Sequence, residues 1–396
     1  MNIIMFSDNK VWSLGKGSGA PSFYNTLKLY NDKGDKVFLV QPQNVADNFA
    51  ELENVNIISF KESVFFKFNN IKKIGYFAKI ICHIKNTKNY KREAKKIVYK
   101  HKIDLLYAYE IDGVAAAKKL EKKLKLPIVT RYQGTILSNI KLNILNRIRY
   151  VLHVRAIQTK SNLCIMTNDG TNGDIVLQKL KNDSPTLFLR NGVNKCNIDE
   201  NLIKELNIKF KSNNETILMT LSRVENWKKI DRAIKIVKNL IDKSFNVKLL
   251  IIGEGSDVDR LQTLSSNYGI SNRVIFCGKI ERDKVYSYLS IADIFLSLYD
   301  LSNVGNPLLE AMKAGKCIVT LNVGTTNQIV INNENGLIFD IDKITDIPDA
   351  IANILNNKVE ISRLSANALD YANNNFYDWE KRMEIEYKAV TELIKK

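Results

Sequence analysis

Short apolar runs alternate with helical segments along the whole chain, and this alternation limits the possible folds more than any other feature of the sequence. Such runs are typical of buried parallel strands, and the segments between them are typical of helices that cover a sheet. The pattern occurs twice, so we predict an α/β protein with two doubly wound parallel sheets. The strands expected in the first half are Asn2–Phe6, Val37–Val40, Leu105–Tyr109, Ile128–Arg131 and Leu163–Thr167. Those expected in the second half are Ile217–Leu221, Val247–Ile252, Arg273–Cys277, Ile294–Leu298, Ile318–Leu321 and Gly336–Phe339.

A polar, turn-rich segment at Leu187–Asn201 separates the two sets of strands and contains the string RNGVN. A chain of 396 residues suits two domains, at roughly 100–200 residues per domain. We therefore expect one domain over residues 1–190 and another over residues 197–376. Because ligands of doubly wound sheets bind beyond the carboxyl ends of the strands, the expected site is a cleft between the two domains.

Positive charge is concentrated in the first half of the chain. The net charge is +17, and residues 1–175 carry 29 Lys and Arg against 14 Asp and Glu. Residues 61–102 alone hold 13 basic residues and two acidic ones. An excess this uneven indicates an anionic partner for the first half.

The chain carries no sequence signal for crossing a membrane or leaving the cell. No stretch reaches the roughly 18 consecutive apolar residues of a membrane-spanning helix. The string MNIIMFSDNK has neither a basic start nor a cleavage site, unlike a signal peptide. The five cysteines lie far apart, which fits a reducing compartment. We therefore expect a cytoplasmic protein.

A glycine-rich loop, Gly15–Ala20, follows the first expected strand and leads into a helix. It formally matches a dinucleotide-binding fingerprint, G-x-G-x-x-G/A. Two features argue against that interpretation: the loop begins several residues after the strand, and the position of the expected ribose-binding acid reads Gln41-Pro42-Gln43. Such a loop still lets a phosphate or a sugar approach backbone amides closely, although a plain loop before a helix is an equally good interpretation.

The string SRVENWKK follows the first strand of the second half and places Arg223 and Lys228 five residues apart. Two cations at a strand end suit a diphosphate, since arginine can bind it in a bidentate manner and lysine acts as a point charge. The alternative is a pair of solvated surface cations.

The string DLSNVGNPLLEAMKAGKCIV combines a polar loop with a helix that begins near Pro307. The first amides of that helix favour an anion or sugar hydroxyls. Glu310 stands one turn inside an otherwise apolar helix, where its carboxylate can accept hydrogen bonds from a ribose diol or can interact with the helix dipole.

Two pairs of acids, Asp257-x-Asp259 and Asp340-x-Asp342, could suggest a metal site. The first pair fits better as the acidic first turn of a helix that Ser256 caps. Three histidines and scattered cysteines offer little else for a metal. We expect no required metal and no cofactor.

Together these strings resemble those of GT-B glycosyltransferases of family 4, which are retaining enzymes that use nucleotide-sugar donors. The resemblance covers nearly the whole chain. It implies two Rossmann-like domains that face each other across a cleft, with a C-terminal helix at residues 377–396 that packs back on the first domain. The strings that carry the resemblance are Gly15–Ala20, IDLLYAYEIDGVAAAKKLEKKLKLPIVTRYQGT, RNGVN, SRVENWKK, LIIGEGSDVDRLQTLSSNYGISNRVIFCGKI, NVGNPLLEAMKAGKCIV and DWEKRMEIEYKAV.

The resemblance also implies roles for individual residues. Arg223 and Lys228 would hold the donor diphosphate and stabilise the leaving group, and Glu310 would bind the donor ribose. Gln133 and Glu110 would lie on the acceptor side. The residues implied in donor binding are Gly17, Ser18, Gly253, Ile280, Ser302, Asn303, Val304, Gly305 and Asn306.

The sequence departs from the family pattern at two positions. The family usually has two glutamates with seven residues between them; Glu310 matches the second, and Ser302 here replaces the first, with Asp300 nearby as a substitute. Gln133 stands where many members have a histidine; glutamine can donate and accept hydrogen bonds but takes no proton near neutral pH.

The interpretation that follows is a retaining glycosyltransferase acting on a lipid-linked or growing glycan in cell-surface polysaccharide synthesis. Residues 61–102 also contain an apolar stripe at helical spacing, formed by Ile71, Ile74, Phe77, Ile81 and Ile84. A basic helix with such a stripe predicts peripheral docking on the anionic inner face of the cell membrane. The alternative is that the stripe packs on the sheet. One alternative is a non-catalytic, nucleotide-sugar-binding partner subunit. Another is a basic nucleic-acid-binding protein, although no recognised nucleic-acid-binding motif is present and no nucleic acid is expected.

Overall fold

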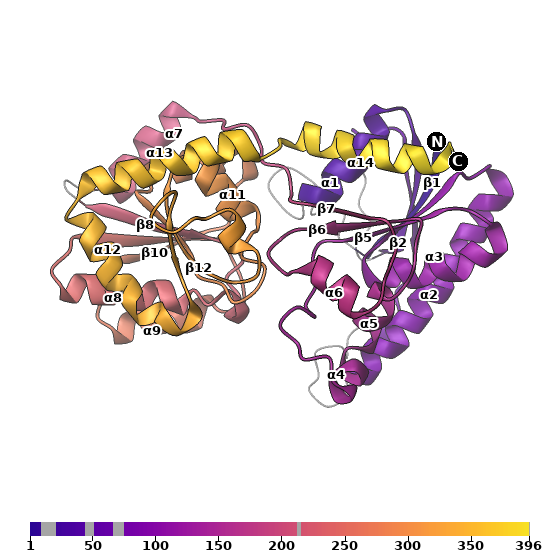
Figure 1. Ribbon diagram of the computed structural model, residues 1–396, viewed down its shortest axis with the longest axis horizontal. Helices are drawn as coiled ribbons and strands as arrows, with labels where there is room; N and C mark the ends of the chain where they lie inside the picture. The colour runs from indigo at the N-terminus through magenta and orange to yellow at the C-terminus, as the bar shows by residue number, and fades with distance from the viewer. Residues whose placement is uncertain (9–20, 44–50, 66–74, 212–214, 396) are drawn as a thin grey trace. The chain divides into compact units, whose positions relative to one another are not determined.

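The computed structural model describes residues 1–8, 21–43, 51–65, 75–211 and 215–395. The chain forms two compact units (Figure 1). Unit 1 comprises Met1–Asn168, Asn172–Arg190 and Trp379–Lys396. Unit 2 comprises Asp169–Thr171 and Asn191–Asp378. The short segment Asp169–Thr171 thus groups with unit 2, although it lies inside the range expected for the first domain.

Unit 1 is built on a parallel seven-stranded sheet in the order β3-β2-β1-β4-β5-β6-β7. The strand order reverses between β1 and β4, which is where doubly wound sheets bind ligands. The strands are β1 (Asn2–Phe6), β2 (Lys36–Pro42), β3 (Val55–Phe60), β4 (Leu105–Tyr109), β5 (Ile128–Tyr132), β6 (Leu163–Thr167) and β7 (Thr186–Leu189). The helices described in this unit are α1 (Pro21–Asp32), α2 (Gly75–Lys100), α3 (Glu110–Leu124), α4 (Ile144–Arg149), α5 (Val151–Ile157), α6 (Gly173–Lys179) and α14 (Trp379–Ile394).

Helices cover both faces of this sheet, and the alternation of side chains along the strands determines which helices each residue meets. Met5 of β1 packs in one core cluster with Leu27 of α1 and Val390 of α14. Phe6, the next residue, packs in the opposite cluster with Tyr90 of α2. The C-terminal helix α14 is therefore part of the core of unit 1 (Figure 1).

Unit 2 repeats this plan with a parallel six-stranded sheet in the order β10-β9-β8-β11-β12-β13, which reverses between β8 and β11. The strands are β8 (Thr216–Leu221), β9 (Val247–Ile252), β10 (Val274–Gly278), β11 (Ile294–Ser297), β12 (Cys317–Leu321) and β13 (Leu337–Phe339). The helices described in this unit are α7 (Glu200–Phe210), α8 (Asp231–Asp242), α9 (Val258–Asn267), α10 (Val285–Ile291), α11 (Asn306–Lys313), α12 (Ile347–Leu355) and α13 (Lys358–Asn375).

The prediction of two doubly wound, Rossmann-like sheets is confirmed. Strands β1, β4, β6 and β9 have the expected bounds, and the other expected strands agree to within a few residues. Two strands were missed, β3 and β7, and both lie at an edge of the first sheet. Most of their residues are only half-buried or exposed, so neither has the continuous apolar run of a central strand.

Candidate functional site

The loop after β8 is held against the loop after β9 by close backbone contacts. Ser222 N–H donates to the Ile252 carbonyl at 3.0 Å, and Val224 N–H donates to the Glu254 carbonyl at 2.8 Å. Gly253 has a φ of +131°, and a Cβ at this position would lie 1.8 Å from the Ser222 carbonyl oxygen. Only glycine fits there. Gly253 therefore fixes the position of the loop that carries the two predicted cations.

Arg223 and Lys228 lie together at this strand end, around the ring of Trp227. The Arg223 guanidinium is 5.7 Å from the centre of that ring, and Lys228 Nζ is 4.2 Å from it. Lys228 Nζ also lies 4.0 Å from the ring of Tyr299, which follows β11. Among the residues that the structure describes, neither cation forms an ion pair with a carboxylate. The aromatic rings orient the cations but leave their charge without a counter-ion.

The surroundings of Lys228 lower its pKa to about 7. Burial has the largest effect, the positive charge of Arg223 adds to it, and the Asp169 carboxylate opposes it. A buried amine beside another cation is unstable in its charged form, and an arriving anion would remove that instability. The arrangement thus favours binding of an anionic ligand.

The loop between β11 and α11 is fixed by Asn303. This side chain is fully buried, accepts a hydrogen bond from Ser297 Oγ at 2.7 Å and donates to Thr320 Oγ1 at 2.7 Å. The side chain of Asn303, which is predicted to bind a donor, thus makes its hydrogen bonds within unit 2. Its neighbour Ser302 has a φ of +54°, in the left-handed region that is unfavourable for serine.

Asp169, which sequence reasoning missed, contacts Ser302. Its Oδ2 accepts a hydrogen bond from Ser302 Oγ at 2.6 Å, and its Oδ1 accepts one from Thr171 Oγ1 at 2.6 Å. Its backbone carbonyl accepts the Val304 N–H at 3.0 Å, so this amide is already occupied, contrary to its predicted role toward a sugar or phosphate. Burial raises the pKa of the Asp169 carboxyl. Asp300, the expected substitute for the missing glutamate, instead pairs with Arg232 at 2.6 Å.

The first turn of α11 has few backbone amides left for a ligand. Gly305 is the N-cap residue, Pro307 has no N–H, and the Leu308 N–H donates to the Gly305 carbonyl at 3.1 Å. The side chain of Asn306 accepts a hydrogen bond from Asn191 Nδ2, in the RNGVN turn, at 2.8 Å. Asn306 Nδ2 is buried and has no hydrogen-bond partner among the described residues. This end of the helix can therefore still donate to a ligand.

Glu310 lies on α11, 5 % exposed, and Arg282 approaches it with Nη2 3.4 Å from Glu310 Oε1. Burial raises the pKa of Glu310 to about 6, and Arg282 limits the rise. The carboxyl group is therefore mostly ionised at neutral pH and can accept hydrogen bonds. Ile280, expected near a nucleoside base, is half-buried two residues before Arg282. Arg282 itself was missed, because it is one of 59 Lys and Arg residues in the chain.

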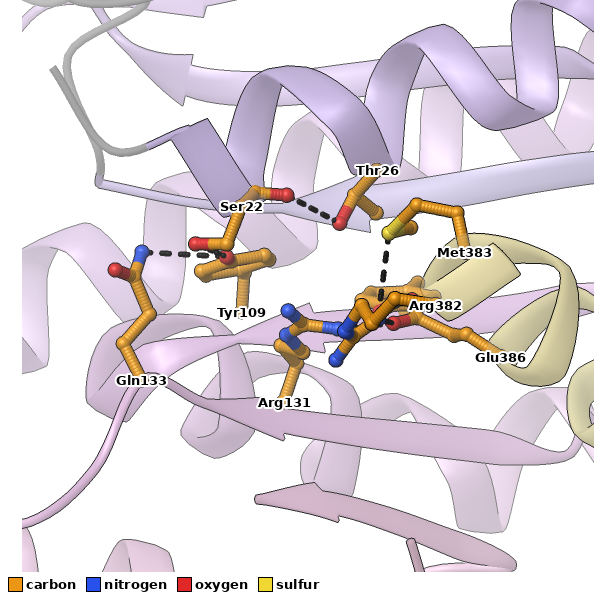
Figure 2. A network of polar contacts seen from close by, with 9 residues as sticks. Ser22, Thr26, Tyr109, Arg131, Gln133, Arg382, Met383 and Glu386 are labelled. Carbon is orange, nitrogen blue, oxygen red and sulfur yellow. Dashed lines mark hydrogen bonds and ion pairs between the residues drawn. The ribbon is translucent and has the colours of Figure 1, made fainter. Parts of the chain in front are cut away.

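The two predicted acceptor-side residues lie next to each other in unit 1. Glu110 Oε1 accepts a hydrogen bond from the Gln133 N–H at 2.8 Å. Gln133 Nε2 donates to the Tyr109 hydroxyl at 3.2 Å, and this hydroxyl lies 3.3 Å from Ser22 Oγ at the start of α1 (Figure 2). The contacts join the ends of β4 and β5 to α1.

Behind Tyr109 lies a fully buried charge cluster (Figure 2). The Arg131 guanidinium is 5.6 Å from the centre of the Tyr109 ring and forms an ion pair with Glu386 of α14. Arg382 pairs with the same carboxylate, which also accepts a hydrogen bond from the Tyr107 hydroxyl at 2.6 Å. These partners overcome the effect of burial and lower the pKa of Glu386 to about 2.

Some predicted features lie elsewhere or outside the described residues. Gly17 and Ser18 fall among residues 9–20, outside the part of the chain that the structure describes. Ser256 does not cap α9, since its hydroxyl donates to Glu225; Asp257 binds Arg260 through both oxygens, at 2.6 and 2.7 Å. Within the described ranges, no three or more His, Cys, Asp and Glu residues gather as a metal site, and no helix is long and apolar enough to span a membrane.

Comparison with known proteins finds a family match for part of unit 2. Residues 203–371 match the family of glycosyl transferases group 1. The uncharacterized glycosyltransferase MJ1069 of Methanocaldococcus jannaschii is 27 % identical over 56 % of this chain and 56 % of its own length. The matched part of the chain thus spans about half the length of this relative.

Two solved structures share the fold of the whole chain. A sucrose-phosphate synthase from Thermosynechococcus elongatus has a TM-score of 0.79 at 16 % identity, with 99 % of both chains covered. Alr3699/HepE from Anabaena, solved in complex with UDP-glucose, has a TM-score of 0.73 at 16 % identity, with 99 % of both chains covered. The chain therefore has the GT-B fold, and its residues 203–371 match the family model of glycosyl transferases group 1.

Proposed function

We propose that the protein is a retaining glycosyltransferase that moves a sugar from a nucleoside diphosphate to a lipid-linked or growing glycan. The observation that carries the proposal is the pair Arg223 and Lys228, which lies at the end of β8 without a counter-ion among the described residues. A donor diphosphate has the negative charge that would balance the two cations and is large enough to contact both. The domain match at residues 203–371, which contains both cations, supports the same interpretation.

The two cations act most strongly as the glycosidic bond breaks. Negative charge then accumulates on the departing diphosphate, and cations already held in place stabilise that state more than the ground state. Arg223 can bind two phosphate oxygens at once, whereas Lys228 becomes fully charged as the phosphate approaches. In this proposal the side chains provide the positive charge, so no metal is required.

The remaining residues orient the donor. Glu310 accepts hydrogen bonds from the ribose diol, and Asn306 Nδ2 at the start of α11 donates to the sugar or phosphate. Asp169 is a positioning residue, because it holds Ser302 and the Val304 amide on the loop that precedes α11.

We place the acceptor at the carboxyl end of the sheet in unit 1, where Glu110 and Gln133 meet. The strongly basic first half of the chain supports an anionic, lipid-linked acceptor, and with it a role in cell-surface polysaccharide synthesis at the inner face of the membrane.

A second candidate function is a non-catalytic partner subunit that binds a nucleotide sugar without turning it over. The observation that favours it is Ser302, whose side chain is bonded to Asp169 where the resembled family has a glutamate. This protein would bind donors alone but release no nucleotide until its partner is added.

A thermal-shift screen with UDP, GDP, ADP, CMP and TDP tests the proposal first. The binding nucleotide is expected to raise Tm, because a ligand that binds only the folded state stabilises it.

Release of that nucleotide from its sugar donors is then measured for the wild type and for Arg223→Ala. Lys235→Ala, an exposed lysine on α8, is the matched control. No stabilisation by any nucleotide would overturn the proposal; stabilisation without release would select the partner subunit.

A further inference from the structure

Helix α2 turns an apolar stripe toward solvent. Its buried face contains Ala78, Cys82 and Tyr90, and Tyr90 packs in the core cluster on the sheet. Phe77 is 64 % exposed and Ile84, seven residues later on the same face, is 45 % exposed. The expected alternative, that the stripe packs on the sheet, is therefore wrong for these residues; Ile71 and Ile74 lie outside the described ranges.

A second exposed apolar element lies beside the start of α2. Helix α4 has no buried residue, and Ile144 and Leu145 are each 77 % exposed. The Tyr76 hydroxyl on α2 donates to the Ile148 carbonyl on α4 at 2.7 Å, which fixes the two elements next to each other (Figure 1). Sequence analysis did not single out α4, because its string ILNRIR is too short for periodicity to be read.

Basic residues lie on α2 and on the segment before it. A groove of about 290 Å³ runs between α2 and the segment before it, and Lys85 and Lys88 lie on its α2 side with Lys61 opposite. Glu62, Ser63, Val64 and Asn89 complete its lining. Lys85 Nζ lies 4.7 Å over the ring of Phe65, so a cation and an apolar ring meet at the edge of the groove. The basic residues on the rest of α2 are Lys79, Lys91, Arg92, Lys95, Lys96 and Lys100.

We propose that this face of unit 1 docks on an anionic lipid bilayer, which deepens the function proposed above by naming how a lipid-linked acceptor is reached. The docking surface consists of Phe77, Ile84, Ile144, Leu145 and the groove lysines. The apolar side chains enter the boundary between headgroups and acyl chains, and the lysines bind lipid phosphates.

The combination of positive charge and exposed apolar side chains indicates which kind of partner this surface binds. A second copy of the same surface would bring like charges together, which opposes self-association. A nucleic acid would satisfy the lysines but offers no apolar layer for Phe77 and Leu145. An anionic bilayer supplies both phosphates and hydrocarbon.

Co-sedimentation with vesicles tests the proposal. We expect binding to vesicles of phosphatidylcholine and phosphatidylglycerol in equal parts, much weaker binding to pure phosphatidylcholine, and release by high salt. Lys85→Gln with Lys88→Gln should lower the partition coefficient roughly 30-fold, at about fivefold per cation near the surface. Ile144→Ser with Leu145→Ser should lower it about tenfold or more. Exposed Ile208 of α7 supplies the control Ile208→Ser, which should change nothing.

The outcomes separate this proposal from the proposed function. Donor turnover without vesicles should be unaffected by the surface variants, and Arg223→Ala should lose turnover but keep vesicle binding. Equal binding to neutral and anionic vesicles, or no binding, would overturn docking. So would a wild-type dimer in light scattering that the Ile144→Ser, Leu145→Ser variant converts to a monomer. Preferential binding of single- or double-stranded nucleic acid over anionic vesicles would assign the surface to that partner instead.

Discussion

Two pairs of cations lie in the two units, and they differ in whether the fold supplies a counter-charge. In unit 1, Arg131 and Arg382 are fully buried and share the Glu386 carboxylate. In unit 2, Arg223 and Lys228 lie around the ring of Trp227, and no ion pair with a carboxylate is seen for either among the described residues, although Asp169 is near enough to act on the pKa of Lys228. The pKa values show the same contrast, about 2 for Glu386 and about 7 for Lys228. A pair that shares a buried carboxylate holds the fold together, whereas a pair with no ion-pair partner in the described part of the chain is ready for a ligand.

The largest effect is expected from Glu386→Gln, which leaves two buried guanidinium groups without a counter-charge. Breaking a buried ion pair from one side costs about 3–5 kcal/mol. Urea unfolding should show this loss, while Glu384→Gln, at an exposed position on the same helix, should be neutral. Lys228→Met should leave stability unchanged or raised, because it removes a cation that burial destabilises. If Glu386→Gln and Lys228→Met lowered the free energy of unfolding equally, the two pairs would not differ in their contribution to stability.

The same cluster has a pH dependence with a defined sign. The pKa of Glu386 is lowered in the folded state, from 4.5 to about 2. Its contribution to the free energy of unfolding is therefore complete above pH 4.5 and is lost as the pH falls through about 2. Glu386→Gln should remove that part of the acid dependence.

The next effect concerns turnover. Arg223→Ala and Lys228→Ala are each expected to raise the barrier to sugar transfer by roughly 3 kcal/mol, the cost of losing a fixed charge that faces a developing anion. The measurement is kcat with saturating donor, with Lys235→Ala as control. Wild-type rates in both variants would show that these cations have no role in the reaction.

How much of this contrast the sequence could predict depends on the range of the interactions. The sheets and the Arg223–Lys228 spacing are local patterns, and both were predicted. The pairing of Arg131 with Glu386 joins residues 255 positions apart, and that of Asp169 with Ser302 joins residues 133 apart. Only the packed fold brings such groups together. The exposure of Phe77 was also undecidable from periodicity, which shows that a stripe exists but not which way it faces.

A smaller effect is expected from pH on nucleotide binding. Below about pH 7 Lys228 is charged before the nucleotide arrives, so affinity should be flat. At higher pH, binding must take up a proton, and affinity should fall by up to about tenfold per pH unit until the pKa of the complex is reached. Calorimetry in buffers of different ionisation enthalpy measures this uptake. Lys228→Arg should flatten the profile; a flat wild-type profile above pH 7 would contradict the prediction.

Breaking the contact that Asp169 makes should have a more modest effect. Asp169→Asn and Ser302→Ala are each expected to lower kcat/KM roughly fivefold, near 1 kcal/mol, because each frees the loop before α11. Since both remove the same hydrogen bond, the double variant should lose little more than either one. Asp300→Asn, whose carboxylate pairs with Arg232, is the matched control. Additive losses would mean that the two residues act separately.

The smallest effect is expected from removing metal ions. This experiment tests whether Arg223 and Lys228, the pair without a carboxylate partner among the described residues, supply enough positive charge by themselves. If Arg223 and Lys228 together neutralise the diphosphate, dialysis against EDTA should leave turnover within about twofold of the untreated enzyme, because no divalent charge is needed there. Asp257, one of the four acids that could suggest a metal site, is already bound to Arg260. Loss of turnover that magnesium restores would show that the pair alone does not supply enough charge. The same experiment on Lys228→Ala is the stronger test, since a variant missing one cation should respond to added magnesium more than the wild type does.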